Sequence, residues 1–74
     1  MTTLKFKKDK NLNGVYYAKG SDTFYRIEQD ICDEKGKYYL YISKTDFWSK
    51  DETRYCDKVS LATAKKYANE YENK

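Results

Sequence analysis

The segment TFYRIEQDICDEKGKYYLYISK, residues 23–44, predicts an antiparallel β-hairpin, and this hairpin decides the fold. Residues 23–31 and residues 37–44 both show the alternating pattern of half-buried strands. Between them, Asp33 stands at the opening position of a type I turn, and Gly36 stands where a left-handed residue is needed. The two strands should therefore pair antiparallel.

Period-two alternation assigns every side chain of the hairpin to one face of the sheet. The face expected to point inward contains Tyr25, Ile27, Ile31, Tyr38, Leu40 and Ile42. The opposite face contains Phe24, Arg26, Glu28, Tyr39, Tyr41 and Ser43. The first set predicts the core, and the second predicts an exposed surface of the sheet.

The residues before the hairpin predict shorter strands. Leu4 and Phe6 alternate with lysines, which is typical of a half-buried strand. Residues 11–14 supply a turn through two asparagines and a glycine. Residues 15–18 are a β-prone run that ends at the turn-forming residues 19–22.

The residues after the hairpin predict a loop, a short strand and a helix. Residues 45–52 are polar apart from one Phe and one Trp and predict a loop, with a short strand around residues 54–56. Ser60 is a good N-cap and strong helix formers come after it, so a helix is expected from Leu61 to Tyr71. The apolar stripe of this helix is Leu61, Ala64, Ala68 and Tyr71, and its water-facing positions are Lys65, Lys66, Asn69 and Glu70.

The predicted class is α+β: a small antiparallel sheet of three or four strands with one C-terminal α-helix packed on one face. No repeat or boundary divides residues 1–74, so a single domain is expected, with a thin core. One amphipathic helix covers only one face of such a sheet. The other face is therefore expected to stay open to solvent or to a partner.

Composition predicts a soluble domain in the cytoplasm. No stretch approaches the roughly 20 apolar residues that a membrane span requires, and no secretory signal is apparent, so no membrane association is expected. Cys32 and Cys56 are too few for a disulfide scaffold and are interpreted as free thiols, although the sequence does not fix the distance between them.

Catalytic chemistry finds little support in the sequence, so an enzyme is not expected. The chain has no His, which removes the usual acid or base at neutral pH and the commonest zinc ligand. The two cysteines form no CxxC pair. The acidic pairs Asp33-Glu34 and Asp51-Glu52 fall in predicted turns, where solvated carboxylates are common. Neither a metal nor a cofactor is therefore expected.

Aromatic residues make up 18% of the chain, with nine tyrosines among them. Part of this excess fills the core, but the alternation places other rings on the face that the helix cannot cover, where either Tyr16 or Tyr17 joins them. The predicted partner-binding residues are Tyr17, Phe24, Arg26, Tyr39, Tyr41 and Trp48. The competing interpretation is that these rings merely cover the sheet. For Phe47-Trp48, a loop that caps the core and an exposed Trp anchor are equally supported.

Two kinds of partner fit such a surface. Tyr, Trp and Arg are enriched where proteins bind proteins, which favours a protein partner, or a homodimer through the open sheet face. Rings flanked by lysines can instead stack unpaired bases, which gives a nucleic-acid partner as the alternative. The net charge is only +3, and thirteen of the fifteen cations are Lys, so base-specific reading is disfavoured. The run Lys5, Lys7, Lys8, Lys10 suits either an acidic contact or the protection of an edge strand.

In its organisation the chain resembles small orphan proteins encoded by phages and prophages. The resemblance rests on a Tyr-rich "GVYYAKGSDTFYRIE" hairpin, a "GKYYLYI" strand and a closing "SLATAKKYANEYE" helix. Proteins of that kind often bind their targets stoichiometrically, as inhibitors of host defence nucleases or other host enzymes. The resemblance implies a non-catalytic, protein-binding inhibitor and does not identify its target.

Overall fold

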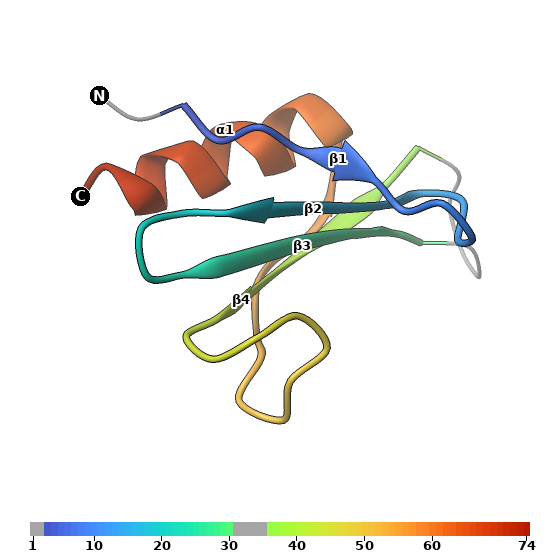
Figure 1. Cartoon of the computed structure of the whole chain (residues 1–74). Coiled ribbons are helices and arrows are strands. Elements are labelled where there is room, and N and C mark those ends of the chain that lie inside the picture. The colour runs from blue at the N-terminus through green and yellow to red at the C-terminus, as the bar shows by residue number, and fades with distance from the viewer. Residues whose placement is uncertain (1–2, 31–35) are drawn as a thin grey trace.

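A single antiparallel sheet and one helix make up the part of the chain that the computed structural model describes, residues 3–30 and 36–74 (Figure 1). In these ranges the elements are β1 (Lys7–Lys8), β2 (Val15–Lys19), β3 (Phe24–Gln29), β4 (Tyr38–Ser43), β5 (Thr53–Val59) and α1 (Leu61–Glu72). The strands lie in sequence order, each antiparallel to the next. The α+β class with one C-terminal helix is confirmed. The expected strand number is wrong, since five strands are present in these ranges rather than three or four.

The strands of the central hairpin β3–β4 pair antiparallel, and their side chains point to the predicted faces. Tyr25 pairs with Ile42 and Ile27 with Leu40, and all four side chains are buried in the core. Fully burying one such aliphatic side chain stabilises the fold by about 2 kcal/mol. Gly36 has the expected left-handed φ of 79°. The rest of the predicted turn, with Ile31 and Cys32, lies outside the described residues.

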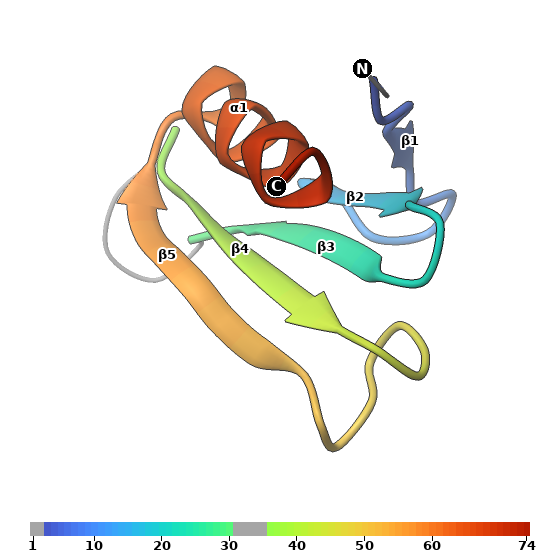
Figure 2. The ribbon, with the colours of Figure 1, turned by 90° about the vertical axis from the view of Figure 1, so that its left-hand side faces the viewer.

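Strand β5 is longer than the short strand predicted at residues 54–56. The prediction was too short because two irregularities interrupt the alternation of side chains along this strand. Tyr38 pairs with Val59, Leu40 with Cys56 and Tyr41 with Arg54, so β5 holds extra residues between successive pairs. One of these, Lys58, has a φ of 54°. Bulges of this kind bend a strand and increase its twist, and β5 is visibly curved (Figure 2).

The N-terminal segment packs along the helix before it joins the sheet (Figure 1). Leu4 is buried and Phe6 is half-buried against the core, as predicted, but both precede β1 and neither belongs to a strand. The backbone NH of Leu4 donates to Asn69 Oδ1 at 2.7 Å. Asn69, which was expected to face water, therefore ties the N-terminal segment to α1.

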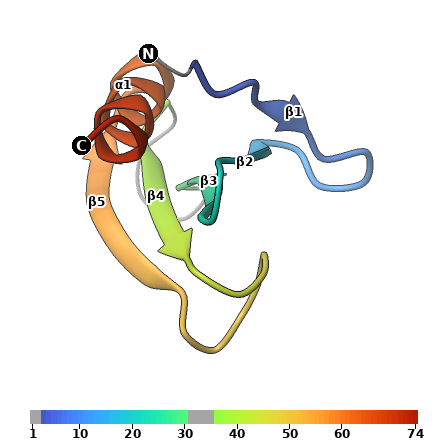
Figure 3. The same cartoon turned by 60° about the vertical axis from the view of Figure 1, so that its left-hand side comes forward.

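Helix α1 begins as the sequence predicts. Ser60 is the N-cap, and its side chain accepts a hydrogen bond from the Thr63 backbone NH at 3.2 Å. Ala64 and Ala68 are fully buried against the sheet, and Leu61 and Tyr71 pack beside them. The helix lies over one face of the curved sheet and leaves the other face to the loop between β4 and β5 (Figure 3).

Candidate interaction surface

A row of side chains crosses the sheet on the face opposite α1. In register, Lys7 lies opposite Tyr17, Tyr17 opposite Arg26, Arg26 opposite Tyr41, and Tyr41 opposite Arg54. Cations and tyrosine rings therefore alternate across all five strands, and we call these five residues the alternating row. Neighbours in such a row are close enough for their side chains to interact.

The two arginines of the chain both stack on rings of this face. The Arg26 guanidinium lies 4.2 Å from the centre of the Tyr41 ring, and the Arg54 guanidinium lies 4.4 Å from that of Tyr39. Arg54 Nη2 also donates to the Tyr41 hydroxyl at 3.0 Å. Planar guanidinium groups favour such stacking more than ammonium groups do, which explains why Arg rather than Lys occupies these two positions.

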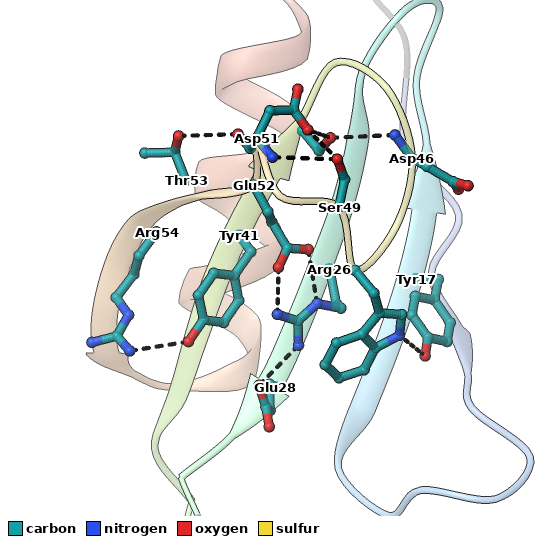
Figure 4. A network of polar contacts seen from close by, with 12 residues as sticks. Tyr17, Arg26, Glu28, Tyr41, Asp46, Ser49, Asp51, Glu52, Thr53 and Arg54 are labelled. Atoms are coloured by element: carbon teal, nitrogen blue, oxygen red, sulfur yellow. Dashed lines mark hydrogen bonds and ion pairs between the residues drawn. The ribbon is translucent and has the colours of Figure 1, made fainter.

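A loop folds back across this face, and we call residues 44–52 the covering loop. The Trp48 ring lies 3.6 Å from the Arg26 guanidinium, and Trp48 Nε1 donates to the Tyr17 hydroxyl at 2.8 Å (Figure 4). Phe47 packs against Tyr17 and, edge-on, against Phe24. Trp48 nevertheless remains 51% exposed. The loop thus covers the sheet face away from the core rather than the core itself, and the indole stays accessible.

Arg26 is buried beneath Trp48 and does not flank an open patch, which corrects the sequence-based expectation for this residue. It is only 4% exposed. Its Nε and Nη2 donate to the Glu52 carboxylate at 2.8 and 2.6 Å, and its Nη1 donates to Glu28 at 2.8 Å (Figure 4). Burial alone would lower the pKa of Arg26, but the two carboxylates raise it above its usual value. The expectation of a wholly open face is wrong for the same reason, since the covering loop occupies its centre.

Asp51 fixes the shape of the covering loop. Its carboxylate accepts hydrogen bonds from the hydroxyls of Ser43, Thr45 and Ser49, with Ser43 Oγ at 2.7 Å and Thr45 Oγ1 at 2.8 Å. These bonds, that of Ser49 foremost, hold the pKa of Asp51 well below its usual range. Trp48 has a φ of 59°, a left-handed conformation that costs a non-glycine residue about 1 kcal/mol. The loop therefore presents the indole in a fixed position despite that cost.

Tyr39 completes the exposed part of the face. Its hydroxyl donates to Asp30 Oδ2 at 2.8 Å, and this bond to a carboxylate raises the pKa of Tyr39 to about 12. The rings of Tyr39 and Tyr41 are half-buried, with 6.5 Å between their centres. Together with Arg54 and Trp48 they form an accessible surface of rings and one cation, which we call the ring surface.

The six residues predicted to bind a partner all lie on this face or over it. They are Tyr17, Phe24, Arg26, Tyr39, Tyr41 and Trp48. Tyr17 rather than Tyr16 is the tyrosine of β2 on this face, since Tyr16 packs against the core on the helix side. The prediction missed Arg54 and Glu52. Arg54 could have been found from its rarity, as one of two arginines, but no pattern in the sequence indicates that Glu52 pairs with Arg26.

Other kinds of site find no support within residues 3–30 and 36–74. No three His, Cys, Asp or Glu side chains gather there as a metal site would require. Cys56 is half-buried, and burial raises the pKa of its thiol, which disfavours the reactive thiolate. In the same part of the chain, no helix combines the length and the apolar character needed to cross a bilayer.

Comparison with known proteins adds no relative. No protein-family model, no curated protein and no solved structure matches this chain. The fold and the geometry of this face are therefore the basis for any functional inference.

Proposed function

We propose that this chain is a non-catalytic binding module that holds a protein partner on the ring surface, formed by Tyr39, Tyr41, Trp48 and Arg54. The single observation that supports the proposal most directly is the conformation of Trp48. A half-exposed indole is held in a left-handed conformation by a loop with its own hydrogen-bond network. Strain kept at an exposed aromatic residue points to a use for that residue, because a strain-free loop would serve as a simple cover.

The chemistry of the ring surface favours protein over nucleic acid. Rigid aromatic rings and arginine supply much contact area at small entropic cost, and each retains a polar group for hydrogen bonding. Carboxylates interrupt the same face, since Glu28 and Glu52 flank Arg26, and Asp57 lies 3.8 Å from Arg54. A phosphodiester backbone would be repelled by these groups. The organisation shared with small phage-encoded proteins makes a host enzyme, inhibited by stoichiometric contact, the kind of partner that we propose.

Affinity capture from a bacterial lysate tests this function. We expect the immobilised chain to retain a protein that survives nuclease treatment and moderate salt, and we expect Trp48→Ala, or Tyr39→Ala combined with Tyr41→Ala, to lose it. Removing central aromatic contacts from an interface typically weakens binding by about thirtyfold or more. Circular dichroism of each variant checks that the fold is retained.

Tyr55→Ala is the matched control, because Tyr55 is a comparably exposed tyrosine, 42% accessible, whose ring packs on Tyr71 of the helix. Its variant should retain the partner. Capture that disappears on nuclease treatment would replace the proposal with the nucleic-acid alternative. Equal losses for Tyr55→Ala and Trp48→Ala would also contradict it. Sedimentation of the purified chain reveals whether the retained partner is a second copy.

A further inference from the structure

A hollow rimmed by lysines lies beside the covering loop, at the β1 edge of the same face. Its volume is about 330 Å³, and its lining residues are Lys5, Lys7, Tyr17, Ala18, Lys19 and Phe47. The register explains why three lysines line it. Lys7 lies opposite Tyr17 in the antiparallel pair of strands. Lys5 is two residues from Lys7, and Lys19 is two residues from Tyr17, so both fall on the same face.

The three lysines are not neutralised by the chain itself. Among the residues that the structure describes, Lys5, Lys7 and Lys19 form no ion pair, whereas Arg26 in the next part of the face is bonded to two carboxylates. The nearby Asp9 is already engaged by the Tyr17 hydroxyl and by two backbone NH groups. The hollow therefore has a positive rim, and positive rims attract anionic ligands.

The floor of the hollow is apolar. Its apolar part is formed by the rings of Tyr17 and Phe47, which pack on each other with 4.8 Å between their centres. The side chain of Ala18, which also borders the hollow, belongs to the core on the helix side. An apolar floor inside a cationic rim fits a ligand with the same arrangement: one apolar side chain with carboxylates on both sides of it.

We infer that this hollow binds an acidic segment of the protein partner, one in which an apolar side chain is flanked by Asp or Glu residues. The inference rests on the proposed function, because it names the chemistry of the partner. Protection of an edge strand accounts for lysines on β1, but it accounts neither for Lys19 on the inner strand β2 nor for the apolar floor.

A nucleic-acid ligand fits the hollow less well. The Phe47 ring is half-buried and already contacts the rings of Phe24 and Tyr17, so a base would find only part of it to stack on. Lysine also lacks the forked geometry that binds phosphates bidentately. Further along the same face, a phosphodiester chain would meet Glu28 and Glu52.

Fluorescence anisotropy with labelled probes tests the inference. The first probe is a peptide of sequence Glu-Asp-Leu-Phe-Glu-Asp, the second replaces its Leu-Phe with Gly-Gly, and the third is an eight-nucleotide oligothymidine. We expect the first to bind several-fold more tightly than the second and more tightly than the third. Replacing Lys5, Lys7 and Lys19 together by Gln should weaken the first interaction by about tenfold, since three exposed ion pairs are lost.

The matched control replaces three exposed lysines elsewhere, Lys50, Lys66 and Lys74, by Gln. Each triple variant lowers the formal net charge from +3 to 0, because each removes three positive charges. The control should bind the first peptide as the parent does. If either triple variant folds poorly, the single variant Lys19→Gln replaces it and should weaken binding about threefold. Four outcomes would each overturn the inference. The two peptides bind equally, the oligothymidine binds more tightly than the first peptide, both triple variants have equal effects, or no peptide binds. A partner captured through Trp48 in any of these cases would leave the proposed function intact.

Discussion

Arg26 and Arg54 show how far two copies of one residue can differ on one sheet face. Arg26 is 4% exposed and forms three charge-assisted hydrogen bonds to Glu52 and Glu28. Arg54 is exposed and forms one hydrogen bond to the Tyr41 hydroxyl and a loose pair with Asp57 at 3.8 Å. The first arginine therefore supports the structure of the face, and the second is available to a partner.

Arg26→Ala should destabilise the chain by about 3 kcal/mol, because it leaves the nearly buried Glu52 carboxylate without its partner and Trp48 without its stacking surface. Urea denaturation followed by circular dichroism measures the loss. Arg26→Lys keeps the charge but loses the forked geometry, and we expect an intermediate result.

Arg54→Ala serves as the comparison, since it removes the same side chain from an exposed position. It should change the denaturation midpoint far less than Arg26→Ala and should instead weaken partner capture. Equal destabilisation by the two alanine variants would show that burial of Arg26 contributes nothing to the fold.

At the scale of elements, strands with a regular period were predicted well, and strands without one were not. Strands β3 and β4 alternate without interruption, so the faces of Tyr25, Ile27, Leu40 and Ile42 were predicted correctly. Strand β5 was predicted too short because its bulges shift the apolar residues out of the period-two pattern. The expected number of three or four strands was too low because it did not include both edge strands, and both β1 and β5 are present.

The covering loop is the second place where sequence reasoning fell short. The prediction of a loop at residues 45–52 is confirmed, but no periodic signal indicates where a loop packs. Its position depends on contacts between residues distant in sequence: Trp48 with Tyr17 and Arg26, and Glu52 with Arg26. Alternation could therefore assign Phe24, Arg26, Tyr39 and Tyr41 to a face. Because such contacts form only in the folded chain, neither the position of Trp48 nor the burial of Arg26 could be foreseen.

Asp51→Asn should loosen the covering loop without unfolding the sheet. The amide cannot accept hydrogen bonds from three hydroxyls as the carboxylate does, so the fixed position of Trp48 is lost. Trp48 is the only tryptophan of the chain, and its emission therefore reports on the loop alone. We expect a red-shifted emission, stronger quenching by acrylamide and an unchanged far-ultraviolet spectrum.

Glu70→Gln, which removes an exposed carboxylate of α1 on the other side of the sheet, should leave the emission of Trp48 as it is. If Asp51→Asn also leaves it unchanged, Asp51 does not hold the loop, and the stacking of Trp48 on Arg26 suffices to position the indole.

At the scale of the whole molecule, the two faces of the sheet are covered by different elements, one by the helix and the other by a loop. Helix α1 covers one face with small apolar side chains that are fully buried, Ala64 and Ala68. The covering loop covers the centre of the other face through Trp48, which stacks on Arg26 of β3, and Glu52, which pairs with it. The first layer supplies most of the core, and the second leaves rings exposed at its margins. The apolar side chains of this small domain are used on the helix side, so the other face is left with rings and charged groups.

Glu72, the last residue of α1, joins the helix to the turn between β2 and β3. Its carboxylate accepts hydrogen bonds from the Ser21 backbone NH at 2.9 Å and from the Tyr25 hydroxyl at 2.7 Å. Gly20 makes this approach possible, since a Cβ at that position would overlap the Glu72 carboxylate. The bond from Ser21, followed by that from Tyr25, lowers the pKa of Glu72 below its usual 4.5.

This contact predicts an acid-sensitive contribution to stability. Because the folded chain holds Glu72 at a lower pKa than the unfolded chain does, the unfolded state binds the proton first as the pH falls. The stabilisation is fully present above the unfolded value near 4.5 and is lost as the pH falls through the folded value. Glu72→Gln should lower the free energy of unfolding at pH 7 and make it less dependent on pH below 5. Urea denaturation at pH 7, 5, 4 and 3 measures both effects.

Glu70→Gln removes an exposed carboxylate from the same helix and should behave as the parent chain does. If the parent and Glu72→Gln lose stability in parallel on acidification, the link between the helix end and the β2–β3 turn does not contribute to the fold.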